Sequence, residues 1–401
     1  MIAGSRWPLR VLFLTVFIDL MGFGVVVPIL AFVSKEYGAS GMTLGLILGS
    51  FSLMQFLFSP LWGRLSDRIG RRPVLMISLF GNVLGFSCFA LASNVWMLFA
   101  TRIISGIASA SIPAAQAYIA DTADESNRAK EMGRISMAFG LGLVLGPPLG
   151  GLLSAFGADL HLRPNVLPGV AAATLSSIAL LMAIFALPES LSATSAQHGK
   201  GWSIFDNESW RILFGDRALR LGGLAVAVLM CALASLAPIL VLVGRDRYAL
   251  TAREVGYLMG LMGVVVVALQ LGLLHRLVAK FGDIGTALIG AASLVAGLLL
   301  VPLTLIQLLI VAVCLMGLAQ GLCHPSLSAF ISKVAPPAHR GGILGVSSSM
   351  TALARVIGPA LVGFAYDVFR TPGAIGSQVL VVLVGIALLL RIAAGPVAPA
   401  T

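Results

Sequence analysis

Charged residues are scarce in this chain: Asp, Glu, Lys and Arg together make up only 10% of its 401 residues. A soluble domain carries roughly 25% of such residues, so this scarcity excludes an ordinary soluble protein. Hydrophobic residues account for 58% of the chain, and the mean hydropathy is +1.01. The composition therefore predicts a protein that crosses a membrane several times.

Cysteine is also rare, and common catalytic or nucleotide-binding patterns are missing. The four cysteines lie in apolar runs without metal-ligand spacing, so we expect neither disulfides nor a metal site. The pattern Gly-x4-Gly-Lys-Ser/Thr does not occur, which argues against ATP as the energy source. The apolar runs contain no Ser/His, His-Glu-x-x-His or paired-aspartate arrangement. We therefore expect a protein that is not an enzyme and holds no cofactor.

Apolar runs of about 20 residues, long enough to cross a hydrocarbon core of about 30 Å, recur along the whole chain. They predict an all-α membrane protein with twelve transmembrane helices, at about 11–33, 43–62, 74–93, 95–119, 134–156, 166–187, 218–243, 253–274, 285–303, 305–330, 342–366 and 373–395. The first run is too long for the apolar core of a signal peptide, so we expect it to be retained.

The net charge of +10 might suggest nucleic acid as a partner, but the placement of the charge argues against this. With the N-terminus inside, the inner loops and tails hold about three times as many Lys and Arg residues as the outer loops. This bias predicts a multi-pass protein of a bacterial-type inner (plasma) membrane with both termini in the cytoplasm. The bilayer is then its partner, and no nucleic acid is expected.

The second half of the chain repeats the first at a constant spacing of 212 residues. The matches are Arg64-Leu65 with Arg276-Leu277, Gly70 with Gly282, Pro113 with Pro325, Arg128 with Arg340, and Gly146-Pro147 with Gly358-Pro359. One spacing in several separate segments predicts two six-helix pseudo-repeats in parallel orientation, a known transporter architecture. We expect an N-terminal bundle at 1–187, a cytoplasmic linker at 188–217 and a C-terminal bundle at 218–401.

Few ionisable residues lie inside the apolar runs, and Asp19 is the only acid placed deep in one. A carboxylate near the bilayer centre costs roughly 2.5–3.5 kcal/mol, so it faces water or a partner and marks a functional site. Arg102 and Arg355 are the basic residues inside runs, and the residue equivalent to Arg355 is Leu143. Three roles are open for Arg355: pairing with Asp19, binding an anionic substrate group, or holding backbone carbonyls.

Polar residues also share faces of the predicted helices. In the fourth span Arg102, Ser105, Ser109 and Gln116 share a face with Pro113, at steps of three and four residues; in the second span the polar residues are Ser52, Gln55 and Ser59. Polar faces in lipid turn towards protein or water, so we expect them to line a substrate cavity. The alternative is single hydrogen bonds between helices.

Two further polar residues lie within the spans. Asn82 either contacts substrate or bonds a neighbouring helix, and His324 is either a packed side chain or a proton relay.

The segment after the second span reads Gly63-Arg-Leu-Ser-Asp67-Arg68-Ile-Gly70-Arg71-Arg72-Pro73. Gly63 would allow another helix to approach closely. Asp67 lies among arginines, and such a cluster suits a latch whose ion pairs break when helices rearrange. We assign Arg128 to the same gating region. The alternative is that these arginines only maintain topology.

The fifth span carries Gly142-x3-Gly146-Pro147-x2-Gly150-Gly151. Gly146 and Gly150 lie four residues apart on one helix face, which predicts close contact with another helix. Pro147 removes a backbone hydrogen bond and is expected to bend the span. Together these features suit a helix that seals one gate, although ordinary tight packing would also explain them.

The segment from Gly63 to Pro73 resembles the signature loop of the major facilitator superfamily. The span-five pattern resembles the motif of its drug/proton antiporter branch. The tetracycline resistance antiporters are similar in further motifs, namely Asp19-x2-Gly22-x-Gly24-x3-Pro28, Leu53-Met54-Gln55, Arg102-x3-Gly106 and Ala117-Tyr-Ile-Ala-Asp121. The resembled antiporters have further membrane acids in spans three and nine. This chain has none there, so proton coupling would rest on Asp19.

The resemblance implies a secondary transporter driven by the proton gradient, with multidrug or tetracycline-like efflux by alternating access. Its partners would be protons and a small amphipathic substrate, and we expect a monomer. One alternative is uptake or export of a metabolite or lipid by the same fold. A membrane sensor is the alternative outside transport, and it would usually carry a soluble output domain.

Overall fold

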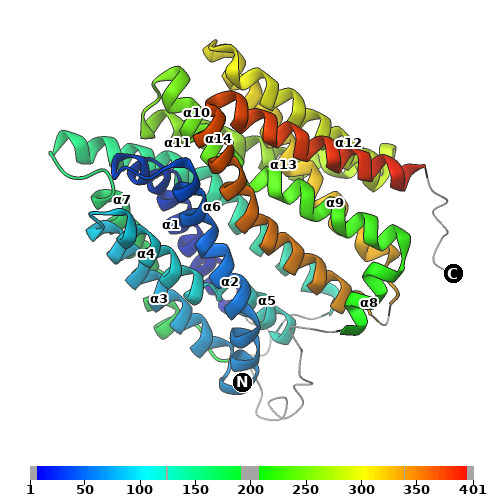
Figure 1. The fold of residues 1–401 in the computed structure, drawn as a ribbon. Helices are drawn as coiled ribbons and strands as arrows, with labels where there is room; N and C mark the ends of the chain where they lie inside the picture. The colour runs from blue at the N-terminus through cyan, green and yellow to red at the C-terminus, as the bar shows by residue number, and fades with distance from the viewer. Residues whose placement is uncertain (1–6, 123–124, 191–206, 338, 395–401) are drawn as a thin grey trace. The chain divides into compact units, whose positions relative to one another are not determined.

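The computed structural model describes residues 7–122, 125–190, 207–337 and 339–394, and these contain helices and no strand (Figure 1). The first half comprises α1 (Trp7–Glu36), α2 (Gly41–Ile69), α3 (Arg71–Leu91), α4 (Val95–Ala108), α5 (Ser111–Thr122), α6 (Glu125–Asp159) and α7 (Val166–Ala186). The second half comprises α8 (Asn207–Gly215), α9 (Arg217–Ala234), α10 (Leu236–Tyr248), α11 (Ala252–Ala268), η2 (Leu269–Leu273), α12 (Leu274–Leu300), η3 (Val301–Leu303), α13 (Ile306–Val334) and α14 (Arg340–Ala393).

Ten helical segments of the described chain are long and apolar enough to cross a membrane. Two of them, Ala252–Leu303 and Arg340–Ala393, have 52 and 54 residues, more than twice the roughly 20 residues of one crossing. Each contains a residue with non-helical backbone angles, Gly282 in the first and Arg370 in the second. Figure 1 shows the chain reversing direction between the brown and red parts of α14. The segments thus agree with twelve spans.

The fourth span is confirmed as one candidate crossing, Val95–Thr122, but it is not one continuous helix. α4 ends at Ala108 and α5 begins at Ser111, with Ser109 outside the helical region at ψ 71°. Pro113 explains the break, because it has no N–H to donate to the carbonyl of Ser109 and its ring clashes with that group. The expected single polar face from Arg102 to Gln116 is therefore divided between two helices.

Contacts divide the chain into two compact units. The first unit comprises Met1–Gly38, Leu53–Trp202 and Ala252–Gly260, and the second comprises Ala39–Ser52, Ser203–Thr251 and Leu261–Thr401. The start of α2 thus belongs to the second unit, and the start of α11 belongs to the first. The predicted bundle boundaries at 187 and 218 stay a prediction.

In the first unit, α1 packs closely against α6 through glycines on both helices. A Cβ on Gly24 would lie 2.6 Å from the carbonyl oxygen of Gly142, and one on Gly146 would lie 2.6 Å from the Cα of Gly24. Gly150 faces the backbone of Val25 in the same way. The predicted close approach at Gly146 and Gly150 is therefore confirmed, and the partner is α1.

The second unit repeats this contact between α9 and α14. Gly358, the equivalent of Gly146, lies against the backbone of Cys231. Further along α14, the carboxylate of Asp367 accepts hydrogen bonds from the backbone N–H groups of Gly41 and Met42, at 2.6 and 2.8 Å. Asp367 therefore places negative charge at the N-terminal end of α2, where unpaired N–H groups favour it.

The glycine contact predicts a stability difference between two positions of α6. Gly146→Val should lower the free energy of unfolding by about 1–3 kcal/mol, because the added side chain meets the α1 backbone. Gly133→Val is the matched control, since a Cβ on Gly133 meets nothing within 4 Å. Thermal unfolding in detergent measures both variants, and equal melting temperatures would contradict the close packing of α1 on α6.

Candidate functional site

Asp19 lies on α1 in the interior of the first unit, and its side chain is 3% exposed. Its carboxylate accepts three hydrogen bonds: from Asn82 Nδ2 at 2.9 Å, from Ser111 Oγ at 3.0 Å and from Ser176 Oγ at 3.2 Å. These donors belong to α3, α5 and α7, and all three are neutral. The structure thus holds the acid in a polar cage that carries no compensating positive charge.

Ser111 and Ser176 were missed by the sequence analysis. Ser176 is a polar residue within the apolar run 166–187, and this could have marked it as a candidate site residue. Nothing in the sequence indicates that its partner lies on α1. Asn82 donates its hydrogen bond to Asp19 on the neighbouring helix α1. A bond to a neighbouring helix is one of the two roles that the sequence left open for Asn82. The bond orients the Asp19 carboxylate.

The other predicted cavity residues of the first unit contact protein. Gln55 Nε2 donates to Ser109 Oγ at 2.9 Å, which connects α2 with the break after α4. The buried Arg102 lies over the ring of Phe23, with its Cζ atom 5.4 Å from the ring centroid. The Ser105 hydroxyl packs against Gly85 of α3. Their role in lining a substrate cavity stays a prediction.

Arg355 lies on α14 of the second unit, and its side chain is exposed. The described residues of this unit include no hydrogen-bond or ion-pair partner for it. Of the three roles considered for Arg355, the structure therefore gives no support to holding backbone carbonyls.

The segment from Gly63 to Pro73 is helical except at Gly70, so its expectation as a loop is wrong. α2 continues to Ile69, α3 starts at Arg71, and the turn between them is Gly70 with φ 107°. The expected close approach at Gly63 is also wrong: Gly63 is exposed, and a Cβ there would meet nothing within 4 Å. Gly63 lies on the outer face of the last turns of α2.

Arg71 is the centre of the polar cluster at this turn. Its guanidinium forms ion pairs with Asp67 at 2.5 Å and with Asp121 of α5 at 2.8 Å. Arg68 is exposed, whereas Arg72 donates to the carbonyls of Ala183 and Ile184 at the end of α7. The cluster therefore joins α2, α3, α5 and α7, and Arg128 lies on α6 with its side chain outside the described part.

Glu189 belongs to this cluster, although the sequence analysis assigned it to the linker. Its carboxylate accepts hydrogen bonds from the backbone N–H groups of Arg71 and Arg72, at 2.9 and 3.1 Å. It thereby satisfies donors that the first turn of α3 leaves free. The first residues of the predicted linker are thus attached to the first unit, at the turn where the ion pairs lie.

The second unit contains the equivalent turn with its charges exchanged. Gly282, the counterpart of Gly70, also has positive φ, at 70°. Asp283 stands at the position of Arg71 and Lys333 at the position of Asp121, and these two form an ion pair at 2.6 Å. The repeat therefore conserves the geometry of the pair and inverts its sign.

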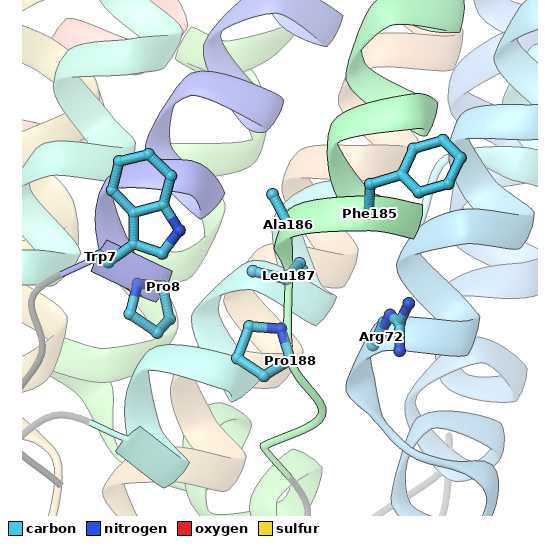
Figure 2. A pocket seen from close by; sticks show the side chains of 7 residues that line it. All are labelled: Trp7, Pro8, Arg72, Phe185, Ala186, Leu187 and Pro188. Atoms are coloured by element: carbon cyan, nitrogen blue, oxygen red, sulfur yellow. The ribbon is translucent and has the colours of Figure 1, made fainter. Parts of the chain in front are cut away.

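A separate pocket of 530 Å³ lies in the first unit, where α1 begins and α7 ends (Figure 2). Its lining is mostly apolar and consists of Trp7, Pro8, Arg72, Phe185, Ala186, Leu187 and Pro188. Trp7 is 60% exposed, as is typical of tryptophan at a membrane interface, and Phe185 is 83% exposed. Arg72 precedes Asn82 by ten residues, or about 15 Å along α3, so this pocket is distinct from the Asp19 cage.

The cap on α3 generates one prediction. Glu189→Ala should lower the free energy of unfolding by about 1 kcal/mol, because two N–H groups lose their acceptor. Glu189→Gln keeps an acceptor oxygen without the charge and should lose less. Thermal unfolding in detergent measures the difference, and wild-type stability in the alanine variant would show that the cap contributes nothing.

The inverted ion pair generates another prediction. Lys333→Asp places two carboxylates opposite each other and should destabilise the second unit, whereas Asp283→Lys combined with Lys333→Asp should restore most of the loss. Lys333 is 63% exposed, so the coupling between the two residues is at most about 1 kcal/mol. A double-mutant cycle on melting temperature gives this coupling, and additive single effects would contradict the pairing.

Comparison with known proteins places this architecture in a family. The model of the Major Facilitator Superfamily matches residues 12–307 and 248–400. The tetracycline resistance protein, class E, of Escherichia coli is 32% identical over 362 residues, covering 88% of this chain and 87% of that protein. Multidrug resistance protein 2 of Bacillus subtilis is 28% identical over 371 residues, covering 89% and 88%.

A solved structure shares the fold. The human organic anion transporter MFSD10 (TETRAN) superposes with a TM-score of 0.70 and 24% identity, covering 96% of this chain and 99% of that one. The resemblance to drug/proton antiporters that the sequence motifs carry is therefore confirmed by the family match and by the resistance proteins. The chain is a multi-pass membrane transporter that belongs to the Major Facilitator Superfamily.

Proposed function

We propose that this protein is a proton-coupled antiporter of a bacterial-type inner membrane, with both termini in the cytoplasm, that exports a small amphipathic compound. Two features support export. Relatives of about 30% identity over most of the chain are named for tetracycline and multidrug resistance. The α6 glycine pattern that resembles the antiporter motif also makes a backbone contact with α1. Alternating access by movement of two repeats suits this fold.

The cage around Asp19 is the observation that carries the proposal. An ionised carboxylate buried among neutral donors has no cation to compensate it, and its neutral form is the less costly one inside a membrane. Taking up a proton therefore changes the charge of the interior of the first unit without breaking an ion pair. Asn82, Ser111 and Ser176 keep the carboxylate oriented in either state, because amide and hydroxyl groups also accept hydrogen bonds.

Asn82 limits the number of acids in the cage around Asp19. The position of α3 that faces Asp19 holds an amide, so the cage contains one acid. Proton coupling in this chain then rests on a single carboxylate. Uptake and release of a proton by Asp19 drive the export of cargo. We propose a small amphipathic compound and leave tetracycline itself as one member of the panel to be tested.

The cluster at Gly70 supports a gating role. Arg71 shares its charge between Asp67 on α2 and Asp121 on α5. A movement of α2 relative to α5 must break one of these pairs, so small energy differences shift the balance between states. We therefore assign Asp67, Arg68, Gly70, Arg71 and Arg72, with Arg128, to the gating region.

The test uses inverted membrane vesicles in which a pH gradient is read by a quenched acridine dye. Wild-type protein should release protons from the vesicles when members of a drug panel are added. Asp19→Asn should abolish this release, because an amide side chain does not take up or release a proton. Asp159→Asn, an exposed carboxylate at the end of α6, is the control and should behave as wild type.

A second readout separates coupling from folding. Asp19→Asn should still exchange the same compound down its own gradient, since the substitution is nearly isosteric. Gradient-driven proton release at the wild-type rate in Asp19→Asn would overturn the proposal. Accumulation of the panel compounds inside the cell, with the gene present, would instead favour uptake.

A further inference from the structure

Two basic side chains lie within apolar helices of the second unit, and neither is among the three donors that bond Asp19. Arg355 is on α14 and His324 is on α13. The two helices contact each other within this unit. Both side chains are exposed, although the helices that carry them are strongly apolar.

The neighbours of Arg355 show what kind of space it faces. Leu353 and Ile357 are 50% and 49% exposed, and each is two residues from Arg355, or about 200° around the helix. Exposed aliphatic side chains suit lipid, whereas an exposed guanidinium in hydrocarbon is costly. The side of α14 that suits lipid is therefore that of Leu353 and Ile357, and Arg355 lies on the opposite side of the helix.

None of the carboxylates described in the second unit neutralises this pair. Each of the five acids described there has another partner: Glu208 lies near His339, Asp216 caps α9, Asp246 bonds Tyr366, Asp283 pairs with Lys333, and Asp367 caps α2. Among the described residues of this unit, neither Arg355 nor His324 has a hydrogen-bond or ion-pair partner. An arginine in a membrane needs an anion or water, and the described acids of this unit supply no anion to it.

The repeat shows that the fold does not require these two residues. At the spacing of 212 residues, His324 corresponds to Ile112 and Arg355 corresponds to Leu143. Both basic residues thus replace apolar ones, on adjacent helices and only in the second half. Neutral donors accompany them: Gln320 and Ser328 lie one turn on either side of His324, and Ser348 lies two turns before Arg355.

We propose that Arg355 and His324 form an anion-binding element of the cargo site and take a carboxylate, sulfonate or phosphate group of the transported compound. This rests on the proposed function, because the occupant is its cargo. The guanidinium fork matches the oxygens of such groups and binds them through two parallel hydrogen bonds. The His324 ring adds a further N–H donor. Cargo of this protein is therefore an amphipathic organic anion, in contrast to a lipophilic cation.

Two dyes with the same xanthene skeleton test the proposal: fluorescein, an anion, and rhodamine 123, a cation. Binding to the purified full-length protein is measured by fluorescence anisotropy in nanodiscs of phosphatidylcholine, which supply no anionic lipid. Wild type should bind fluorescein at least about tenfold more tightly than rhodamine 123. Arg355→Gln should weaken fluorescein binding by about tenfold and leave rhodamine 123 nearly unchanged.

Matched variants separate the site from general charge and from folding. Arg355→Lys and His324→Gln should each lose part of the fluorescein affinity. Arg391→Gln, an exposed arginine near the end of α14, should lose none. Equal binding of the two dyes by wild type, binding of neither, or an unchanged fluorescein affinity in Arg355→Gln would each overturn the proposal.

A measurement without any cargo gives an independent answer. In a chain whose four cysteines are replaced by alanine, Ser348→Cys is labelled with an anionic and a cationic methanethiosulfonate. Adding Arg355→Gln should lower the ratio of anionic to cationic labelling rates several-fold, whereas Arg391→Gln should not; an unchanged ratio counts against the site. Dye binding that depends on Arg355 without proton-driven dye export would contradict the proposed antiport and leave the anion site standing.

Discussion

The backbone contact between α1 and α6 determines the chemistry of the first unit. Because Gly24, Gly142 and Gly146 have no side chains, the two helices meet backbone to backbone, and α1 is held in one rotation about its axis. That rotation directs Asp19 away from α6 and towards α3, α5 and α7, where Asn82 and two serines donate hydrogen bonds to its carboxylate. In a membrane, where hydrophobic association is weak, such close packing is a main source of helix affinity.

The two halves conserve geometry more strictly than charge. Gly70 and Gly282 both take positive φ between two spans, and in each half the next residue forms an ion pair with the end of a later helix. The first half places the positive charge on Arg71, and the second places the negative charge on Asp283. An ion pair joins two helix ends equally well in either direction, so the repeat could exchange the signs without disturbing the fold.

The interior charges of the two units differ in kind, and this suits a division of tasks. The first unit encloses a carboxylate among neutral donors, an arrangement that a proton can neutralise. The second unit presents Arg355 and His324, with which none of its described acids pairs, and the proposed anion site rests on this arrangement. The equivalent of Asp19 is Cys231, and the equivalents of His324 and Arg355 are Ile112 and Leu143. The fold that the two halves share therefore requires none of these three ionisable residues.

The sequence by itself determined the family and the all-α membrane fold, predicted twelve spans and singled out Asp19, because hydropathy, glycine spacing and an isolated charge are local properties of the chain. It also predicted the close contact at Gly146 and Gly150 without naming α1 as the partner. The structure decided the partners: Ser111 and Ser176 around Asp19, Glu189 and Asp121 at Arg71, and Lys333 opposite Asp283. It also corrected Gly63 and divided the fourth span at Ser109. These features depend on which residues distant in the chain meet, and helix packing sets that, whereas the sequence shows only spacing along one helix.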